Sequence, residues 1–126
     1  MGSITRSVES ETNLTVMTVV GEADAPMVLA EILSFLLVAP TRQVLWDIRL
    51  GILTEMSPNA LRMIVHRAGP FARVRDGGQT AIVCSRDVDF GLCRMFQTFA
   101  EQSKIPFEIH VSRDIDEARR WLGTGR

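Results

Sequence analysis

The chain has 126 residues, of which 46% are hydrophobic and 23% are charged, and its 14 basic and 15 acidic side chains give a net charge of -1. This length and apolar content fit one folded domain and argue against disorder. A net charge near zero gives no excess of positive charge of the kind that binds nucleic acid. No membrane-spanning stretch, signal peptide or myristoylation pattern is found. We therefore expect one cytoplasmic domain over residues 1–126, with residues 1–3 as a candidate disordered end.

Five segments have the pattern of β-strands. Residues 4–11 are polar, as in an exposed edge strand, and residues 11–13 turn the chain back. Three further runs are apolar on both faces, which is typical of strands covered on both sides. These runs are residues 14–20, 44–48 and 80–84. Residues 105–111 alternate between apolar and polar, which predicts an edge strand whose one wet face carries Pro106, Glu108 and His110.

Four helices are expected, each after a residue whose side chain can cap a helix N-terminus. The four cap residues are Asp24, Ser57, Asp87 and Asp114. Pro58 supports the second helix, because proline is favoured in the first turn, and Glu117 completes a capping-box pattern in the fourth. The resulting alternation of strands and helices predicts an α/β fold, in which a five-stranded, mostly parallel mixed sheet is covered by four helices.

This order of elements resembles the STAS, or anti-sigma-factor antagonist, fold, and in more detail the SpoIIAA-like family of small bacterial proteins. The likeness runs from Leu14 onward and is carried by three stretches. These are residues 44–49 (VLWDIR), 80–83 with 90–96 (TAIV and FGLCRMF), and 113–118 with 121–122 (RDIDEA and WL). The resemblance implies a non-enzymatic regulatory module without a cofactor. Its implied partner is another protein or a second copy of the chain in a homodimer.

Ser57 is the first candidate functional residue. In the antagonists, a serine at the start of the helix after the third strand is phosphorylated, which blocks binding to a partner kinase, and the resemblance places Ser57 at that position. Met56 stands where the antagonists have an aspartate, and Pro58 follows. The residues themselves favour an N-cap, whose hydroxyl accepts a backbone N–H. Both interpretations, cap alone and phosphorylation switch, remain open.

Polar side chains follow the ends of the expected parallel strands. Because ligands bind at the carboxyl edge of open α/β sheets, four residues are candidates for a rim that holds a polar ligand or a partner loop. They are Asp24, Asp47, Arg49 and Ser85. Asp47 stands in an otherwise buried strand, and a buried carboxylate needs a partner, for which Arg49 is nearest in the sequence.

The expected helix over residues 27–39 (MVLAEILSFLLVA) has almost no polar face, because only Glu31 and Ser34 interrupt it. It is too short to span a bilayer. Its outer face is therefore covered by a second subunit or by the chain itself, or it forms an apolar-ligand groove or meets a membrane surface. The candidate interface or groove residues are Met27, Leu29, Ile32, Leu33, Phe35 and Leu36.

An alternative function follows from this helix: a carrier or sensor of lipid-like ligands that associates peripherally with membranes. The likeness of the STAS architecture to the lipid-binding CRAL-TRIO architecture favours it at the level of the fold. A basic stretch predicts a solvated helix face that would meet anionic head groups in that case. Its members are Arg62, His66, Arg67, Arg73 and Arg75.

Motifs for catalysis, phosphate binding and metal binding are not found in the sequence. We therefore expect no catalytic residue and no metal site. Cys84 and Cys93 are too few for a disulfide framework and do not form a CxxC pair. They are predicted to be buried, reduced thiols.

Overall fold

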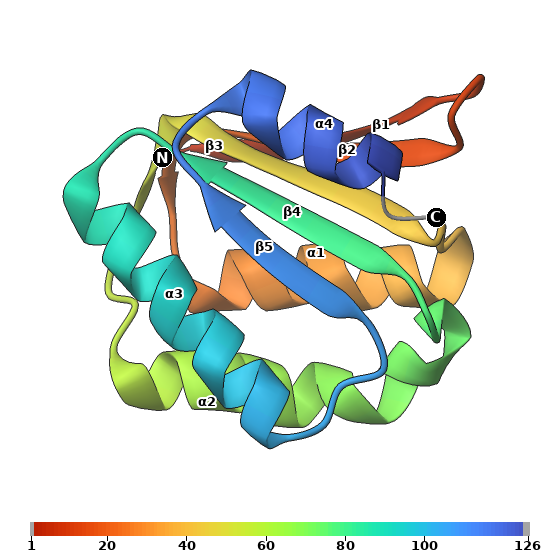
Figure 1. The fold of residues 1–126 in the computed structure, drawn as a ribbon. Coiled ribbons are helices and arrows are strands. Elements are labelled where there is room, and N and C mark those ends of the chain that lie inside the picture. Colours follow the sequence, from red (N-terminus) through yellow and green to blue (C-terminus); the bar gives the residue numbers. More distant parts are fainter. Residues whose placement is uncertain (1, 125–126) are drawn as a thin grey trace.

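A five-stranded mixed sheet forms the centre of the computed structural model, which describes residues 2–124 (Figure 1). The strands lie side by side in chain order: β1 (Ser3–Glu9), β2 (Leu14–Ala23), β3 (Gln43–Leu53), β4 (Gln79–Cys84) and β5 (Glu108–Ser112). β1 is antiparallel to β2, and the other neighbouring strands are parallel. The predicted mostly parallel sheet is confirmed.

Four α-helices cover the sheet: α1 (Ala25–Val38), α2 (Pro58–Ala68), α3 (Asp87–Gln102) and α4 (Ile115–Thr124). A 3-10 helix, η1 (Gly69–Arg75), continues directly from α2. α1, α2 and α3 lie on one face, which we call the helix face, and α4 lies on the other, the α4 face (Figure 1). The predicted α/β fold with four helices is therefore also confirmed.

Each face of the sheet has its own core. Successive side chains of a strand point to opposite faces, so Val44, Trp46 and Ile48 of β3 join the core under α1–α3, whereas Leu45 joins the core under α4. The α4 core is the smaller of the two. Its buried members are Leu14, Val16, Leu45, Ala81, Val83, Ala118 and Leu122.

Several strand boundaries differ from the predictions. β2 and β3 extend to Ala23 and Leu53, three and five residues beyond the predicted ends. The register shifts between Thr18 and Val20, where residues 48 and 49 of β3 lie opposite residue 19 of β2, and the two strands stay paired along the extension. Gly51 allows the close approach, because a Cβ there would lie 2.7 Å from a methyl carbon of Val19. Most residues of the two predicted runs are buried, whereas the extensions carry exposed side chains such as Leu50 and Ile52.

The outer strands differ as well. β5 begins only at Glu108, so Pro106 lies before the strand, where its carbonyl accepts the Gly77 N–H at 2.8 Å. β1 covers residues 3–9 rather than 4–11. Of the three residues expected to form a disordered end, Ser3 lies in β1 and Gly2 donates its N–H to the Glu22 carbonyl. Met1 lies outside the described residues.

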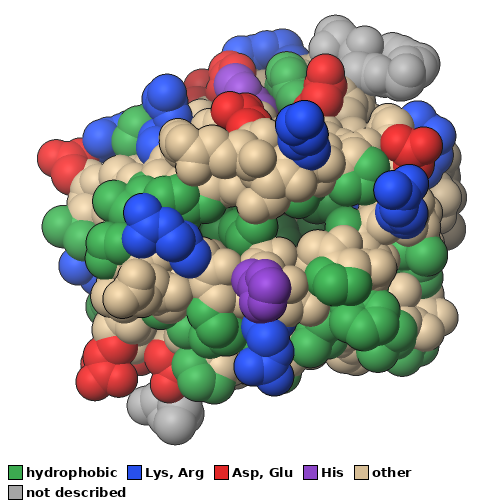
Figure 2. All heavy atoms as spheres, turned by 90° about the horizontal axis from the view of Figure 1, so that it is seen from below, with side chains coloured by type: hydrophobic (Ala, Val, Ile, Leu, Met, Phe, Trp, Pro, Cys, Tyr) green, Lys and Arg blue, Asp and Glu red, His purple; other side chains and the backbone are tan. Residues whose placement is uncertain are grey.

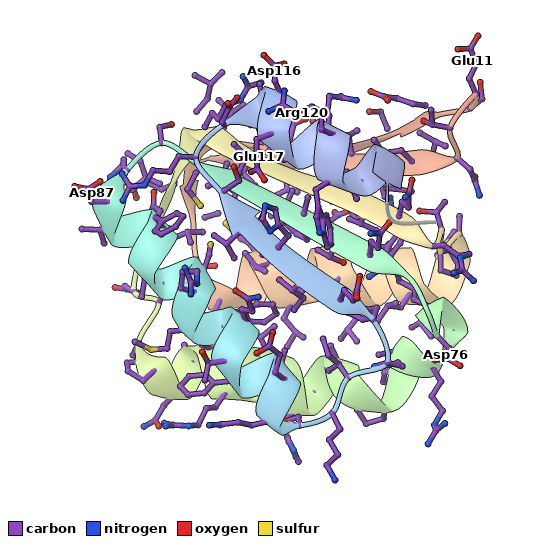
Figure 3. The ribbon with its side chains drawn as sticks, in the orientation of Figure 1. Glu11, Asp76, Asp87, Asp116, Glu117 and Arg120 are labelled. Carbon is purple, nitrogen blue, oxygen red and sulfur yellow. The ribbon has the colours of Figure 1, made fainter. Side chains whose placement is uncertain are left out.

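Two of the four predicted helix caps form as expected. Asp24 accepts the Met27 N–H and Ser57 accepts the Ala60 N–H, both at 3.1 Å. The prediction for Asp87 is wrong. It lies inside the first turn of α3, after an extended Arg86, and pairs with Arg113 at the outer end of that helix (Figure 3).

The predicted capping box of α4 forms only in part. Asp114 accepts the Asp116 N–H at 3.0 Å, but its own N–H donates to Ser112 Oγ rather than to Glu117. Glu117 instead contacts His110 Nε2 at 2.8 Å (Figure 3). His110 is also stacked on Trp121, with ring centroids 5.0 Å apart. The predicted wet face of β5 is confirmed only in part: Glu108 is exposed, whereas α4 half-buries His110, whose side chain is 31% exposed.

Candidate functional site

α4 leaves part of its face of the sheet uncovered. It packs mainly on β4 and β5, so within residues 2–124 no helix lies above the carboxyl halves of β2 and β3. Val20, Leu50 and Ile52 are 45%, 74% and 38% exposed there. Val20 lies opposite Leu50 in the register, and Ile52 follows two residues along the same strand. These three side chains form an apolar surface that we call the open patch.

A bidentate ion pair lies beside the open patch. Arg49 donates from Nε and Nη2 to the two carboxylate oxygens of Asp47, at 2.9 and 2.8 Å. These hydrogen bonds hold the pKa of the Asp47 carboxyl below its ordinary value. Ser85 Oγ donates to the Arg49 carbonyl at 2.7 Å. The structure therefore brings together three of the four predicted rim residues and confirms the expected pairing of Asp47 with Arg49.

The position predicted for this group is nevertheless wrong. Asp47 and Arg49 lie in the middle of β3, on the α4 face, because the strand continues to Leu53. Asp24 is separate from them: it follows the end of β2, where its carboxylate caps α1. The four residues thus do not form one rim at the carboxyl edge of the sheet.

Ser57 lies at the end of the β3–α2 loop, and its side chain is exposed. The loop is held by backbone hydrogen bonds at its start. Thr54 donates to the Ala23 carbonyl at 3.0 Å, and Leu53 donates to Asp89 Oδ1 at 3.3 Å. Met56 is buried and anchors the loop from within. Ser57 is therefore an accessible hydroxyl on a fixed segment.

Asp89 is a buried polar residue that was not predicted from the sequence. It is fully buried in the first turn of α3, and its Oδ2 has no hydrogen-bond partner among the described residues, although Arg86 Nε lies 3.9 Å away. The signal was present in the helical spacing, since residue 89 is four residues before Cys93 on the apolar face. Through Leu53, Asp89 positions the strand end from which the Ser57 loop begins.

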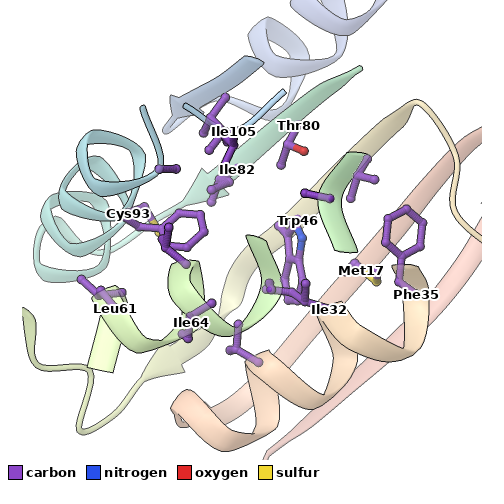
Figure 4. Close-up of a pocket in the computed structure, with 18 of the residues that line it drawn as sticks. Met17, Ile32, Phe35, Trp46, Leu61, Ile64, Thr80, Ile82, Cys93 and Ile105 are labelled. Atoms are coloured by element: carbon purple, nitrogen blue, oxygen red, sulfur yellow. The ribbon is translucent and has the colours of Figure 1, made fainter. Parts of the chain in front are cut away.

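A second site is an apolar cavity of about 120 Å³ between the sheet and helices α1–α3 (Figure 4). The side of the molecule seen in Figure 2 has a hollow with hydrophobic side chains at its bottom. The cavity walls come from four strands, all three helices of that face and η1. Among the lining residues are Met17, Ile32, Phe35, Trp46, Leu61, Ile64, Ile82, Cys93 and Ile105.

The cavity accounts for half of the predicted groove on the first helix. Ile32, Phe35 and Leu36 line it, whereas Met27, Leu29 and Leu33 pack against other core side chains. None of these six residues is exposed. The sheet, α2, η1 and β1 cover α1, and the exposed large side chains of this helix are Leu37 and Val38 at its end.

The polar end of the cavity is formed by Arg75 and Thr80. The prediction that Arg75 belongs to a solvated face is wrong, because the residue is 3% exposed. Its guanidinium donates to Thr80 Oγ1 and to three backbone carbonyls, those of Thr41, Arg42 and Gln79, at 2.7–2.8 Å. Burial lowers its pKa to about 9. Arg75 thereby ties the start of β3 to the start of β4.

The two cysteines lie together under α3. Their sulfur atoms are 3.5 Å apart, both side chains are buried, and both thiols are free, as predicted. The hydrogen bond with Cys84 and burial raise the pKa of the Cys93 thiol well above its ordinary value. Cys93 is therefore a neutral thiol in the wall of the cavity rather than an activated nucleophile.

Comparisons with known proteins support the fold. No family model matches the chain, and no curated protein matches it. Among solved structures, an anti-sigma factor antagonist from Mycobacterium paratuberculosis superposes with a TM-score of 0.56 at 18% identity, over 96% of this chain and 95% of the other. The chain has the SpoIIAA-like fold.

A second solved structure agrees with that result. It is an uncharacterized protein from the DUF3478 family with a SpoIIAA-like fold, from Shewanella loihica PV-4, and it superposes with a TM-score of 0.55 at 16% identity. The match covers 96% of this chain and 93% of that chain. At such low identities the likeness establishes the fold and leaves the function to be argued from the sites.

No helix within residues 2–124 has the length and hydrophobicity needed to cross a membrane. The same part of the chain contains no group of three or more histidine, cysteine or acidic residues placed to hold a metal ion.

Proposed function

We propose that the protein is a non-enzymatic regulatory module of the SpoIIAA/STAS type, which docks a protein partner on the open patch. The observation that carries this proposal is the exposure of Val20, Leu50 and Ile52 beside the Asp47–Arg49 pair. An apolar centre with a polar border is the usual anatomy of a protein interface. The fold likeness to an anti-sigma factor antagonist supports a regulatory role.

The shape of the open patch favours a protein over a small molecule. Small-molecule sites are concave, whereas these three side chains stand on a sheet surface that no helix covers. Arg49 is already paired with Asp47, so its charge is oriented before a partner arrives. A second copy of the chain can also occupy the patch, because a homodimer uses the same surface on both subunits.

Ser57 is the proposed phosphorylation switch of this module. Its hydroxyl is exposed and stands at the N-terminus of α2, where the helix dipole favours negative charge. Phosphorylation there would replace the cap by a dianionic group with further acceptor oxygens and change the surface offered to a partner. The module is expected to act in the cytoplasm.

The test uses a kinase of the anti-sigma-factor type from the same genome, with ATP. We expect one phosphate per chain and none on Ser57→Ala. Isothermal titration of the unphosphorylated protein with this kinase should give binding that Leu50→Glu weakens at least tenfold. Leu37→Glu is the matched control, because Leu37 is 65% exposed at the far end of α1. Phosphate at another residue, or equal binding by both variants, would contradict the proposal.

Sedimentation of the same variants tests self-association. A dimer of the wild-type chain that dissociates in Leu50→Glu but not in Leu37→Glu identifies a second copy as the occupant of the open patch. A dimer that both variants retain places the homodimer interface elsewhere.

The cavity favours a second candidate function, which is the binding of an apolar ligand. Its volume of about 120 Å³ is below the range of drug-sized pockets and close to that of an apolar cavity of about 150 Å³ that holds benzene. The ligand therefore has the size of one ring or a short chain. Native mass spectrometry of the purified protein should show the chain with such a mass bound, and a ligand-free spectrum after incubation with ring-sized compounds would argue against it.

Peripheral membrane association is part of the same second candidate function. α1 ends against η1 (Figure 1), and this end of the molecule exposes Leu37, Val38, Phe71 and Val74. Arg73, also exposed, adds positive charge there. Co-sedimentation with vesicles of anionic phospholipid should therefore fall when Leu37 is changed to Glu and remain unchanged in Leu50→Glu. Equal co-sedimentation of both variants would contradict this mode of contact.

A further inference from the structure

The guanidinium of Arg75 has one donor left over at the cavity. A guanidinium carries five N–H groups. Four of them donate to acceptors in the protein. The Nε N–H donates to the Thr41 carbonyl, and the two Nη2 N–H groups donate to the carbonyls of Arg42 and Gln79. One of the two Nη1 N–H groups donates to Thr80 Oγ1. The second Nη1 N–H has no acceptor among residues 2–124.

Thr80 contributes another donor at the same place. Its Oγ1 accepts from Arg75 Nη1 at 2.8 Å, so the hydroxyl hydrogen is directed elsewhere. Thr80 and Arg75 both line the cavity, whose other walls are almost entirely apolar (Figure 4). The cavity therefore has an apolar body and one end with two hydrogen-bond donors.

Arg75 also carries a charge that the described part of the chain does not balance. No carboxylate in this part lies within 4.0 Å of its guanidinium nitrogens. The rings of Phe107 and Phe35 lie near the guanidinium, with centroids 4.3 and 5.7 Å from its carbon, and Arg75 is 3% exposed. A buried cation is costly unless it is paired. An anion placed in the cavity would supply that pairing.

We propose that the cavity is a binding site for a small apolar monocarboxylate, whose carboxylate accepts from Arg75 Nη1 and Thr80 Oγ1 while its hydrocarbon part fills the space between Ile32, Trp46 and Ile82. The inference rests on the second candidate function and adds to it the charge of the ligand. Two donors match the two oxygens of a carboxylate. A phosphate would bring more oxygens and up to two charges into a cavity whose walls are otherwise almost entirely apolar.

Size narrows the ligand class further. A cavity of about 120 Å³ accommodates one aromatic ring or a chain of about six carbons, by comparison with the benzene-sized cavity of about 150 Å³. Benzoate and hexanoate are therefore suitable probes. Benzyl alcohol, which has the same ring without the charge, separates the contribution of the carboxylate from that of the apolar walls.

The test is a titration of the full chain with benzoate, hexanoate and benzyl alcohol at pH 7, followed through the methyl resonances of the cavity-lining side chains. We expect benzoate to bind at least tenfold more tightly than benzyl alcohol. Thr80→Val, which keeps the shape of the side chain, should reduce the ratio of the benzoate affinity to the benzyl alcohol affinity at least threefold. Thr18→Val, a strand threonine on the α4 face, is the control and should leave the ratio unchanged.

Ala68→Leu should prevent ligand binding in the cavity, because Ala68 lines the cavity and a larger side chain there fills part of the cavity volume. Loss of benzoate binding in this variant locates the ligand in the cavity, whereas retained binding places it elsewhere and overturns the inference. Equal affinity of wild-type protein for benzoate and benzyl alcohol overturns the monocarboxylate site but leaves the apolar-ligand function standing. If none of the three compounds shifts the cavity resonances, both the inference and the second candidate function fail.

Discussion

The two faces of the sheet are built differently, and each produces its own kind of site. On the helix face, three helices enclose a large core that retains a cavity and a buried Arg75. On the α4 face, one helix covers a small core, and beyond it the sheet exposes the open patch next to ion pairs. Enclosure favours a site for a small molecule, and exposure favours a site for a protein.

The connectivity explains this asymmetry. β2 to β5 follow each other across the sheet in chain order, and right-handed crossovers between them place α1, α2 and α3 on the same face. α4 follows the last described strand and packs on the opposite face. Its 10 residues span about 15 Å, which is too short to cover five strands.

The largest expected effect separates the covered and uncovered parts of the α4 face. Leu45→Ala removes a fully buried side chain beneath α4 and should lower the free energy of unfolding by about 2–5 kcal/mol. Leu50→Ala is the matched control, because Leu50 lies on the same strand and face but is 74% exposed. This substitution should change the free energy of unfolding by less than about 0.5 kcal/mol. Urea unfolding measures both. Similar losses in the two variants would mean that Leu50 is covered in solution.

The next prediction concerns the polar end of the cavity on the helix face. Arg75→Met removes four hydrogen bonds, two of them buried, and should destabilise the protein by about 1–3 kcal/mol, even though it removes a buried charge. Arg73→Met, in the same 3-10 helix but exposed, should be neutral within about 0.5 kcal/mol. Thermal unfolding compares them, and a stabilised Arg75→Met would show that the buried charge dominates.

A smaller effect distinguishes the structural from the regulatory role of Ser57. Ser57→Ala removes the cap of α2 and should cost about 1 kcal/mol, as should Asp24→Ala at the start of α1. Ser57→Asp keeps a capping oxygen and should unfold within about 0.5 kcal/mol of wild type while accepting no phosphate. If Ser57→Asp were as unstable as Ser57→Ala, the cap would depend on the hydroxyl itself.

The smallest effect is the response of the α4 face to acid. Glu9, Asp47 and Glu117 all have pKa values below the ordinary values, because of hydrogen bonds from Arg119 and Arg49 and, for Glu117, from Ser112 and His110. A lowered folded pKa stabilises the protein above the unfolded value, and this contribution is lost as the pH falls through the folded one. We therefore expect stability to decline below about pH 4.5, the ordinary value for glutamate.

Glu9→Gln measures how much the Glu9–Arg119 pair contributes to the loss of stability at low pH. The Glu9–Arg119 pair is exposed, so removing it should change the free energy of unfolding by only about 0.2–1 kcal/mol at pH 6 and by less at pH 3. Urea midpoints at the two pH values give the comparison. If the urea midpoint of Glu9→Gln falls between pH 6 and pH 3 by as much as that of the wild-type protein, this pair is excluded as a source of acid sensitivity.

Local signals in the sequence predicted most of the fold and part of the candidate sites. The period-two and period-3.6 patterns identified all five strands and four helices in order, and the caps Asp24 and Ser57 formed where expected. The pairing of Asp47 with Arg49 was also predictable, because a carboxylate in a buried strand requires a nearby cation. Each of these features depends on residues close together in the chain.

Only the tertiary structure decided which surfaces are covered. α4 does not connect two strands of the described sheet, so the sequence did not show that it lies over His110 or that it stops short of Leu50. Arg75 appeared solvated because its neighbours in the chain are basic, but its acceptors come from residues 41–42 and 79–80, which the sheet brings together. The cavity has the same origin: it is the space left between elements whose separation the packing of the whole chain determines.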